Sequence, residues 1–138
     1  MTMVSAVETM PAIRAMAAAR AAFGLALAFR TEKMLRLMVR DAPATGSLFA
    51  FARTVGVRDL VFGLGALVAA RGDEPSPELT RWVKAWIASD VGDVIGAAAA
   101  SKHIGRGGTL TAVAAPLPFI AAGVWTLRRL SSRSSVLA

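Results

Sequence analysis

The chain has 138 residues, enough for a single domain of ordinary size, and its composition is strongly apolar. Hydrophobic residues make up 55% and charged residues 18%, with a mean hydropathy of +0.54, whereas soluble domains carry about 25% charged residues. This composition excludes a disordered chain and an ordinary water-soluble globule. The absence of cysteine excludes disulfides, thiolate metal sites and a cysteine nucleophile.

The net charge of +7 comes from basic residues that lie between long apolar runs and form no single stripe interleaved with aromatic residues. In a soluble protein such a charge would suggest nucleic acid, but this arrangement is typical of the basic loops of a membrane protein. We therefore expect the lipid bilayer as a partner and no nucleic acid.

Four apolar stretches approach the roughly 20 residues that a helix needs to cross a bilayer. In chain order they are Pro11 to Phe29, Ser47 to Ala70, Trp82 to Ala100 and Thr109 to Leu127. Between the first two, Arg30 to Asp41 mixes basic and apolar residues in an amphipathic pattern suited to the membrane interface. The sequence therefore predicts a single all-α domain, a four-helix transmembrane bundle with a short amphipathic interfacial helix between spans one and two.

Polar segments rich in glycine and proline separate the later spans. Residues 71–77 form the middle hairpin, and Gly105, Gly107 and Gly108 follow His103 in the next turn. Trp82 and Trp86 stand near the start of the third span, where an interfacial aromatic belt is expected. Because His103 has no second histidine or acid at ligand spacing, we expect no metal site and no cofactor.

The basic residues of the loops indicate how the chain is oriented, because such residues tend to stay in the cytoplasm. If both termini and the middle hairpin share one side, that side is slightly richer in basic residues. It holds Arg14, Arg20, Arg71, Arg81, Lys84, Arg128, Arg129 and Arg133, against Arg30, Lys33, Arg36, Arg40, Lys102 and Arg106. We expect a bacterial inner membrane protein with cytoplasmic termini, a bias that narrows if Arg20 lies within the membrane.

Five ionisable residues, which we name the charge cluster, lie near the middle of the first three predicted spans. They are Arg20, Arg58, Asp59, Asp90 and Asp93. A charge at mid-bilayer costs about 2.5 to 3.5 kcal/mol, so such residues usually face the interior of the bundle and pair with one another. The common depth of these five therefore predicts that they meet.

The spacing also predicts the pairs. Asp90 and Asp93 are separated by about 60° around a helix, so both face the same neighbour, and we expect them to pair with the two arginines of the charge cluster. Asp59 would then bond Arg53, a backbone group, a third partner or a proton.

Several interpretations of the charge cluster stay open. It can be a structural clamp that fixes helix register, or a polar site that binds a polar group of a lipophilic small molecule or lipid. Buried carboxyl groups beside arginine can also act as general acid and base. An acid-base isomerase, cyclase or hydrolase on a terpenoid or lipid would use Asp90 or Asp93 as the catalytic proton donor, with Arg20 or Arg58 holding the substrate.

Prolines and glycines add two further expectations. Pro116 and Pro118 predict a bend in the fourth span, which either forms one wall of a pocket or merely curves the bundle. The short glycine spacings at 63–65 and 92–96 predict close helix packing within the chain, or contact with a second copy. Apolar faces of small residues would also suit an accessory subunit of a larger membrane complex.

Two segments of this sequence resemble a pattern in small bacterial and fungal four-helix membrane proteins, a family catalogued as a domain of unknown function. The segments are Gly56-Val57-Arg58-Asp59-Leu60-Val61-Phe62-Gly63 and Ser89-Asp90-Val91-Gly92-Asp93. The resemblance extends from about Ala15 to Leu127, and the chain is distantly similar to the DoxX-type bundles. It implies a four-helix membrane bundle and little about activity, with Arg58, Asp59, Asp90 and Asp93 at its most characteristic positions.

Overall fold

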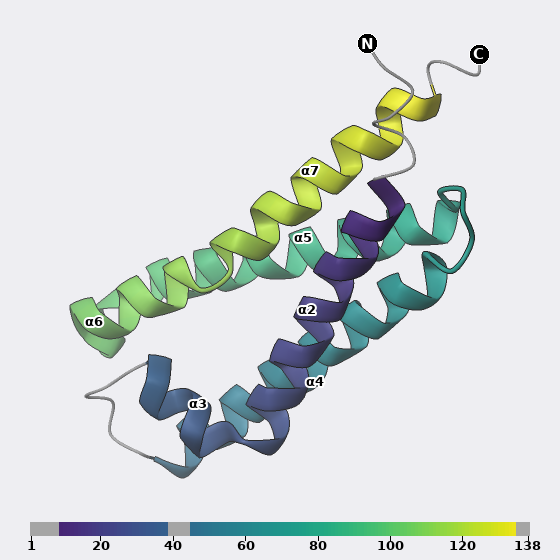
Figure 1. Cartoon of the computed structure of the whole chain (residues 1–138). Coiled ribbons are helices and arrows are strands. Elements are labelled where there is room, and N and C mark those ends of the chain that lie inside the picture. Colours follow the sequence, from purple (N-terminus) through teal and green to yellow (C-terminus); the bar gives the residue numbers. More distant parts are fainter. Residues whose placement is uncertain (1–8, 39–44, 135–138) are drawn as a thin grey trace.

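The computed structural model describes residues 9–38 and 45–134, and all the regular structure within these ranges is helical (Figure 1). The helices are α2 (Thr9–Phe29), α3 (Thr31–Met38), α4 (Gly46–Ala69), α5 (Pro77–Ala99), α6 (Ser101–Ala114) and α7 (Leu117–Ser134). The chain runs out along α2, returns along α4, runs out again along α5 and returns through α6 and α7. The predicted all-α class is confirmed for this part of the chain.

The first three predicted spans correspond to α2, α4 and α5, with one clear change of boundary. Helix α5 begins at Pro77 rather than at Trp82, because Ser76 Oγ accepts a hydrogen bond from the Leu79 amide at 3.1 Å and proline suits the first helical turn. Helix α3 covers most of the predicted interfacial segment, and residues 39–41 of that segment lie outside the described residues.

The predicted fourth span is interrupted rather than continuous. Helix α6 reverses direction at Gly105, whose φ of 69° is a backbone conformation that glycine adopts readily. The predicted turn therefore centres on Gly105, with helical residues on both sides. A second break follows at Pro116, between the end of α6 and the start of α7, as expected for a residue without an amide hydrogen.

Helices α2 and α4 make the most extensive helix pair, and their backbones touch. A Cβ added to Gly56 would lie 2.5 Å from the amide nitrogen of Ala28, and one added to Gly63 would lie 2.4 Å from that of Ala21. No side chain fits at such distances, which is how small residues allow two helices to approach closely. The predicted packing role of Gly63 is confirmed.

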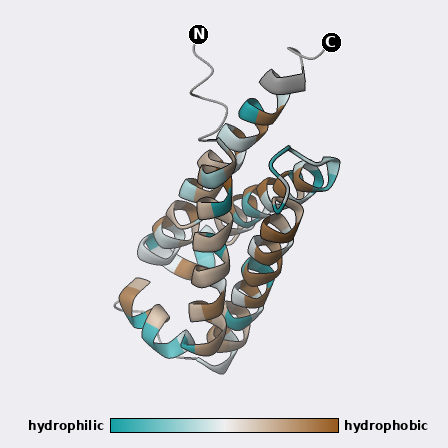
Figure 2. Cartoon of the chain, turned by 45° about the vertical axis from the view of Figure 1, so that its right-hand side comes forward, coloured by the Kyte–Doolittle hydropathy of each residue, from teal (hydrophilic) through white to brown (hydrophobic). Residues whose placement is uncertain are grey.

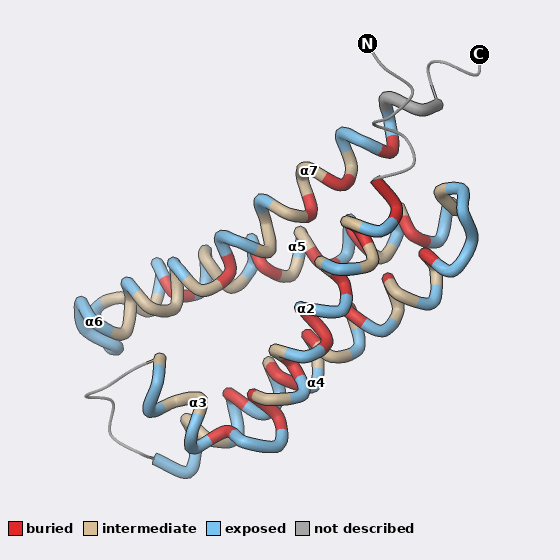
Figure 3. Tube along the Cα trace, viewed as in Figure 1, coloured by how far each residue is buried: buried red, intermediate tan, exposed pale blue. Residues whose placement is uncertain are grey.

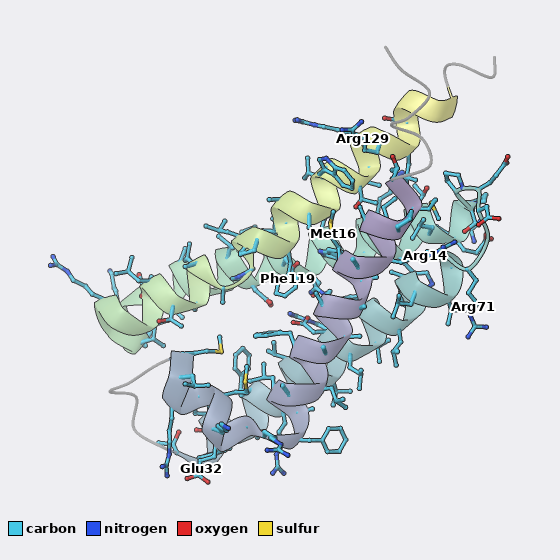
Figure 4. The ribbon with its side chains drawn as sticks, in the orientation of Figure 1. Arg14, Met16, Glu32, Arg71, Phe119 and Arg129 are labelled. Carbon is cyan, nitrogen blue, oxygen red and sulfur yellow. The ribbon has the colours of Figure 1, made fainter. Side chains whose placement is uncertain are left out.

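Arg14 joins the start of α2 to the end of α4. Its Nε donates a hydrogen bond to the carbonyl oxygen of Ala70 at 2.7 Å, and its Nη2 donates to that of Gly72 at 2.9 Å. Figure 4 shows Arg14 near the loop that carries Arg71. A cation at this position satisfies carbonyl groups left free at a helix C-terminus and opposes the negative end of the helix dipole.

The hydrophobic core lies toward the end of the molecule that carries the loop between α4 and α5 (Figure 3). It joins α2, α4, α5 and α7 through Met10, Ile13, Ala17, Ala66, Ala70, Leu79, Val83, Trp86 and Leu130. At the opposite end, none of the residues of α6 is buried, although α2 and α4 stay in close contact there through Gly56 and Ala28. The four helices α2, α4, α5 and α7 therefore converge at one end of the molecule, whereas α6 packs loosely at the other.

Two helical segments are long and apolar enough to cross a membrane, namely Thr9–Phe29 and the run Ser101–Ser131. Figure 2 shows hydrophobic residues along the lengths of the helices and hydrophilic residues in the loop between α4 and α5. Core helices of soluble proteins can have the same length and composition, so these two segments alone do not establish a membrane protein.

Helices α4 and α5 are also long, but charged side chains interrupt their apolar surface. Every stretch of 18 residues in each of these helices includes at least three charged residues. The residues common to all these stretches are Arg53, Arg58 and Asp59 in α4, and Lys84, Asp90 and Asp93 in α5. Four of the six belong to the charge cluster, so the state of that cluster decides how polar these two helices are.

Candidate functional site

Arg20 of α2 occupies the centre of the charge cluster and is completely buried. Its Nη1 donates to Asp90 Oδ2 at 2.6 Å and its Nη2 to Asp90 Oδ1 at 2.7 Å, a two-point pairing that fixes the relative orientation of both groups. The same Nη2 donates to Asp59 Oδ1 at 2.7 Å. The side chains of Arg20, Asp90 and Asp59 are 0%, 2% and 4% exposed, and we call Arg20 with Asp90 the inner pair.

Aromatic rings cover the Arg20 guanidinium. Its Cζ lies 5.5 Å from the ring centroid of Phe62 and 4.9 Å from the rings of both Trp86 and Phe119. Figure 4 shows Phe119 of α7 on the side that faces α2, and its carbonyl oxygen accepts a hydrogen bond from Trp86 Nε1 at 2.8 Å. Cation–π contacts of this kind gain strength when they are shielded from water. Side chains from α2, α4, α5 and α7 therefore all converge on one arginine.

The predicted place of the tryptophans in an interfacial belt is wrong for Trp86, which is 1% exposed. Trp86 precedes Asp90 by one helical turn, so both side chains point to the same face of α5, toward Arg20. Trp82 packs on α4, where a Cβ added to Gly65 would lie 2.5 Å from its ring. The spacing between Trp86 and Asp90 was a signal for this arrangement, because a residue that seals a buried charge belongs on the same face.

Arg58 and Asp93 form a second two-point pair at the edge of the charge cluster, which we call the outer pair. Arg58 Nη1 donates to Asp93 Oδ1 and Nη2 donates to Asp93 Oδ2, both at 2.7 Å. The two side chains are 25% and 29% exposed. Arg58 Nη2 also donates to Asp59 Oδ1 at 3.1 Å, so this one carboxylate oxygen bridges the two arginines.

The predicted pairing of the two arginines with Asp90 and Asp93 is confirmed, and all five members of the charge cluster meet. Asp59 takes neither a backbone partner nor Arg53, whose Nε instead donates to Thr31 Oγ1 at 3.4 Å. Fully ionised, the charge cluster would hold two guanidinium groups against three carboxylates. One negative charge would then remain uncompensated within it.

Two further features of the described residues bear on the chemistry of the charge cluster. Within residues 9–38 and 45–134, the buried Nε of Arg20 has no hydrogen-bond partner. The same ranges contain no group of three or more His, Asp or Glu side chains arranged to hold a metal ion. The chemistry of the site is therefore that of guanidinium and carboxylate groups.

Gly92 and Gly96 of α5, on either side of Asp93 in the sequence, have open space beside them. No atom from another part of the described chain lies within 4 Å of the position that a Cβ on either glycine would take, so the predicted close packing of these two glycines within the chain is wrong. Two surface hollows of the described chain lie away from the charge cluster, one beside Arg81 and Arg128 and the other beside Lys102. The region of Pro116 and Pro118 lines neither hollow, and it contributes the ring of the neighbouring Phe119 to the charge cluster instead.

No protein-family model, no curated protein and no solved structure matches this chain. The resemblance to small four-helix membrane proteins consequently stays a prediction that rests on the two segments around the charge cluster.

Proposed function

We propose that this chain is a four-span integral membrane protein of a bacterial inner membrane, and that its outer pair binds the polar group of a lipophilic small molecule or lipid. The inner pair would hold the spans together. The observation that carries the proposal is the contrast in exposure between two otherwise similar ion pairs: Arg20 is 0% and Asp90 2% exposed, whereas Arg58 is 25% and Asp93 29% exposed.

The surface of the fold supports the membrane assignment. Only 17% of the apolar stretch within Ser101–Ser131 is buried, which is unlike the core helix of a soluble protein. Large apolar side chains are exposed along the helices, and a soluble monomer rarely shows such extended apolar surface. They include Leu25, Phe29, Val57, Val61, Leu64, Val68, Ile95, Leu110 and Leu117.

The charge cluster supports the same assignment because its members neutralise one another. Arg58, Asp59, Asp90 and Asp93, the charged residues that make α4 and α5 polar, are paired across helices. Arg20 alone donates three of the hydrogen bonds in this network. Paired and buried charges are the form in which ionisable groups are tolerated inside a bilayer.

The chemistry of the outer pair indicates the kind of ligand. The excess carboxylate of the charge cluster favours a hydrogen-bond donor such as a hydroxyl or amine group, and Asp93 is the most accessible of the three acids. Val61, one turn from Arg58, is 49% exposed and offers an apolar contact beside the polar one. A molecule with one polar group on an apolar body would satisfy both.

The membrane assignment can be tested by cysteine labelling, because the chain has no cysteine of its own. Single cysteines at the exposed positions Glu74, between α4 and α5, and Lys102, on α6, should be reached by an impermeant maleimide from opposite sides of the membrane. With cytoplasmic termini, intact spheroplasts should label Lys102→Cys and protect Glu74→Cys. Labelling of both from one side would contradict the four spans, whereas the reverse pattern would contradict the orientation alone.

The binding assignment can be tested by native mass spectrometry of the protein purified in mild detergent. We expect a co-purified small molecule on the wild type, lost in Asp93→Asn and kept in the matched control Glu32→Gln, which removes an exposed carboxylate that pairs with Arg36 on α3. Melting temperatures close to that of the wild type would show that both variants are folded. The proposal fails if the wild type carries no such mass, or if Asp93→Asn retains it.

A second function, as an accessory subunit, is favoured by the open face at Gly92 and Gly96 on α5. Small residues without internal contacts leave room for a helix of another chain to approach closely. In this case the protein should co-purify with a larger assembly in mild detergent, and Gly92→Leu should release it without lowering its melting temperature. Migration of the wild type as a monomer would exclude this function.

A further inference from the structure

A hollow of about 690 Å³ lies between the start of α5 and the end of α7, at the tightly packed end of the molecule. Its size falls within the roughly 300 to 1,000 Å³ that is typical of ligand pockets. The residues that matter here line it from both helices: Thr80, Arg81, Lys84, Leu127, Arg128 and Ser131. None of them belongs to the charge cluster, so this hollow is separate from the site described above.

The charged residues of the hollow are all basic. Arg81, Lys84 and Arg128 line it, and no acidic residue does. Lys84 and Arg128 form no ion pair with any other residue in the described part of the chain. Arg81 touches Glu78 at 3.8 Å, but both side chains are largely exposed, a setting in which an ion pair contributes little. The hollow therefore presents at least two uncommitted positive charges.

The side chains, and not the end of the helix, supply the binding groups. Ser76 caps α5, and its hydroxyl is already used, since it accepts from the Leu79 amide at 3.1 Å and donates to the Ala69 carbonyl at 2.9 Å. The Ser131 hydroxyl donates to the Arg128 carbonyl at 3.0 Å, which leaves the hydroxyl of Thr80 beside the basic residues as further polar lining. Arginine, lysine and hydroxyl groups together are the usual partners of phosphate oxygens.

Helix α7 also gives the hollow an apolar part, because Leu127 and the buried Leu130 line it. Arg128 follows the apolar part of α7, and Lys84 lies two turns into α5, so the hollow spans the level at which polar and apolar surfaces of the molecule meet. In a four-span arrangement this is the level of the lipid headgroups. A phospholipid with its phosphate at this level would place its acyl chains along α7.

We propose that this hollow binds a phosphate group, and that in the membrane the group belongs to an anionic phospholipid. The phosphate chemistry stands on the basic lining alone, while the lipid as its source rests on the proposed membrane function. Each lysine or arginine close to an anionic surface contributes about 1 kcal/mol, so loss of two should weaken binding about tenfold or more.

The test compares two double variants of the full chain in detergent. Lys84→Gln/Arg128→Gln removes two charges from the hollow, and Arg30→Gln/Lys33→Gln removes two exposed charges that line neither hollow of the structure. Phosphatidylglycerol retention, measured by native mass spectrometry, should fall about tenfold or more for the first variant and little for the second. Equal losses in the two variants, or no saturable binding to the wild type, would overturn the proposal.

Inorganic phosphate provides the second arm of the experiment. If the source is a lipid, millimolar phosphate should not displace phosphatidylglycerol, and calorimetry should detect no binding of phosphate alone. Tight binding of phosphate alone, lost in Lys84→Gln/Arg128→Gln, would keep the phosphate site and overturn the lipid as its source. The phosphate measurement is made in detergent and does not depend on the four-span assignment. A failure of that assignment would be detected separately by the cysteine labelling.

Discussion

The inner and outer pairs have the same chemistry and differ in their surroundings. Each is an arginine that holds a carboxylate of α5 through two hydrogen bonds, and the two acids are separated by less than one helical turn. The inner pair is enclosed by three aromatic rings, whereas the side chains of the outer pair are 25% and 29% exposed. The comparison shows that enclosure, more than the ion pair itself, separates a structural contact from one that is available for binding.

The largest expected effect comes from removal of the inner arginine. Arg20→Ala leaves two buried carboxylates, Asp59 and Asp90, without their shared partner, and breaking a buried ion pair in this way costs about 3 to 5 kcal/mol. We expect little folded protein, measured as monodisperse yield in detergent. Arg20→Lys should not restore it, because an ammonium group cannot make the same two-point contact.

A normal yield of Arg20→Ala would contradict the central role of this residue. The matched variant Arg58→Ala should fold, since its two-point partner Asp93 is 29% exposed and the buried Asp59 keeps its bond to Arg20.

Substitution of the two acids separates the pairs directly. Asp90→Asn breaks the enclosed two-point contact and should cost about 3 kcal/mol or more. Asp93→Asn affects a partly exposed pair whose arginine retains Asp59, and should cost about 1 kcal/mol or less. Thermal unfolding followed by tryptophan fluorescence would measure both, and equal losses would mean that the difference in enclosure has no energetic consequence.

Alanine substitutions at two glycines should change stability by smaller amounts and in opposite directions. Gly56→Ala forces a methyl group into the backbone of α2 and should destabilise the protein by about 1 to 3 kcal/mol. Gly92→Ala adds the same group where nothing lies within 4 Å, and the better helix propensity of alanine should stabilise the protein by up to about 1 kcal/mol. A loss of stability in Gly92→Ala, seen in the same unfolding measurement, would contradict the open face of α5.

The effect expected from the aromatic cover is smaller than that of the inner pair. Trp86→Phe keeps a ring over Arg20 but removes the hydrogen bond to the Phe119 carbonyl, and should cost about 1 to 2 kcal/mol. If Trp86→Phe were neutral while Trp86→Leu were destabilising, the ring face alone would account for the contribution of this residue.

Much of the site could be predicted because depth and spacing are properties of the sequence. Arg20 stands near the middle of its apolar stretch, and the two acids of α5 lie on one helical face, so their meeting followed from the cost of isolated charges in an apolar setting. The role of Asp59 as a bridge between two arginines could not be predicted, because it depends on the close approach of α2 and α4 at Gly56 and Gly63.

The aromatic enclosure illustrates the same limit. The position of Trp86 one turn before Asp90 was a usable signal, but Phe119 belongs to a different helix and nothing in its local sequence connects it with Arg20. The break at Pro116 could be predicted from the sequence, because proline has no amide hydrogen to donate within a helix. The sequence did not indicate which side of the molecule α7 covers.

The sequence by itself determined the helices, their approximate ends and the level at which the charges lie, because these depend on residue type and on spacing along one chain. Only the tertiary structure decided which ion pair is sealed and which stays accessible. That outcome depends on how closely separate helices approach and which side chains fill the space between them, and neither is a property of any single helix.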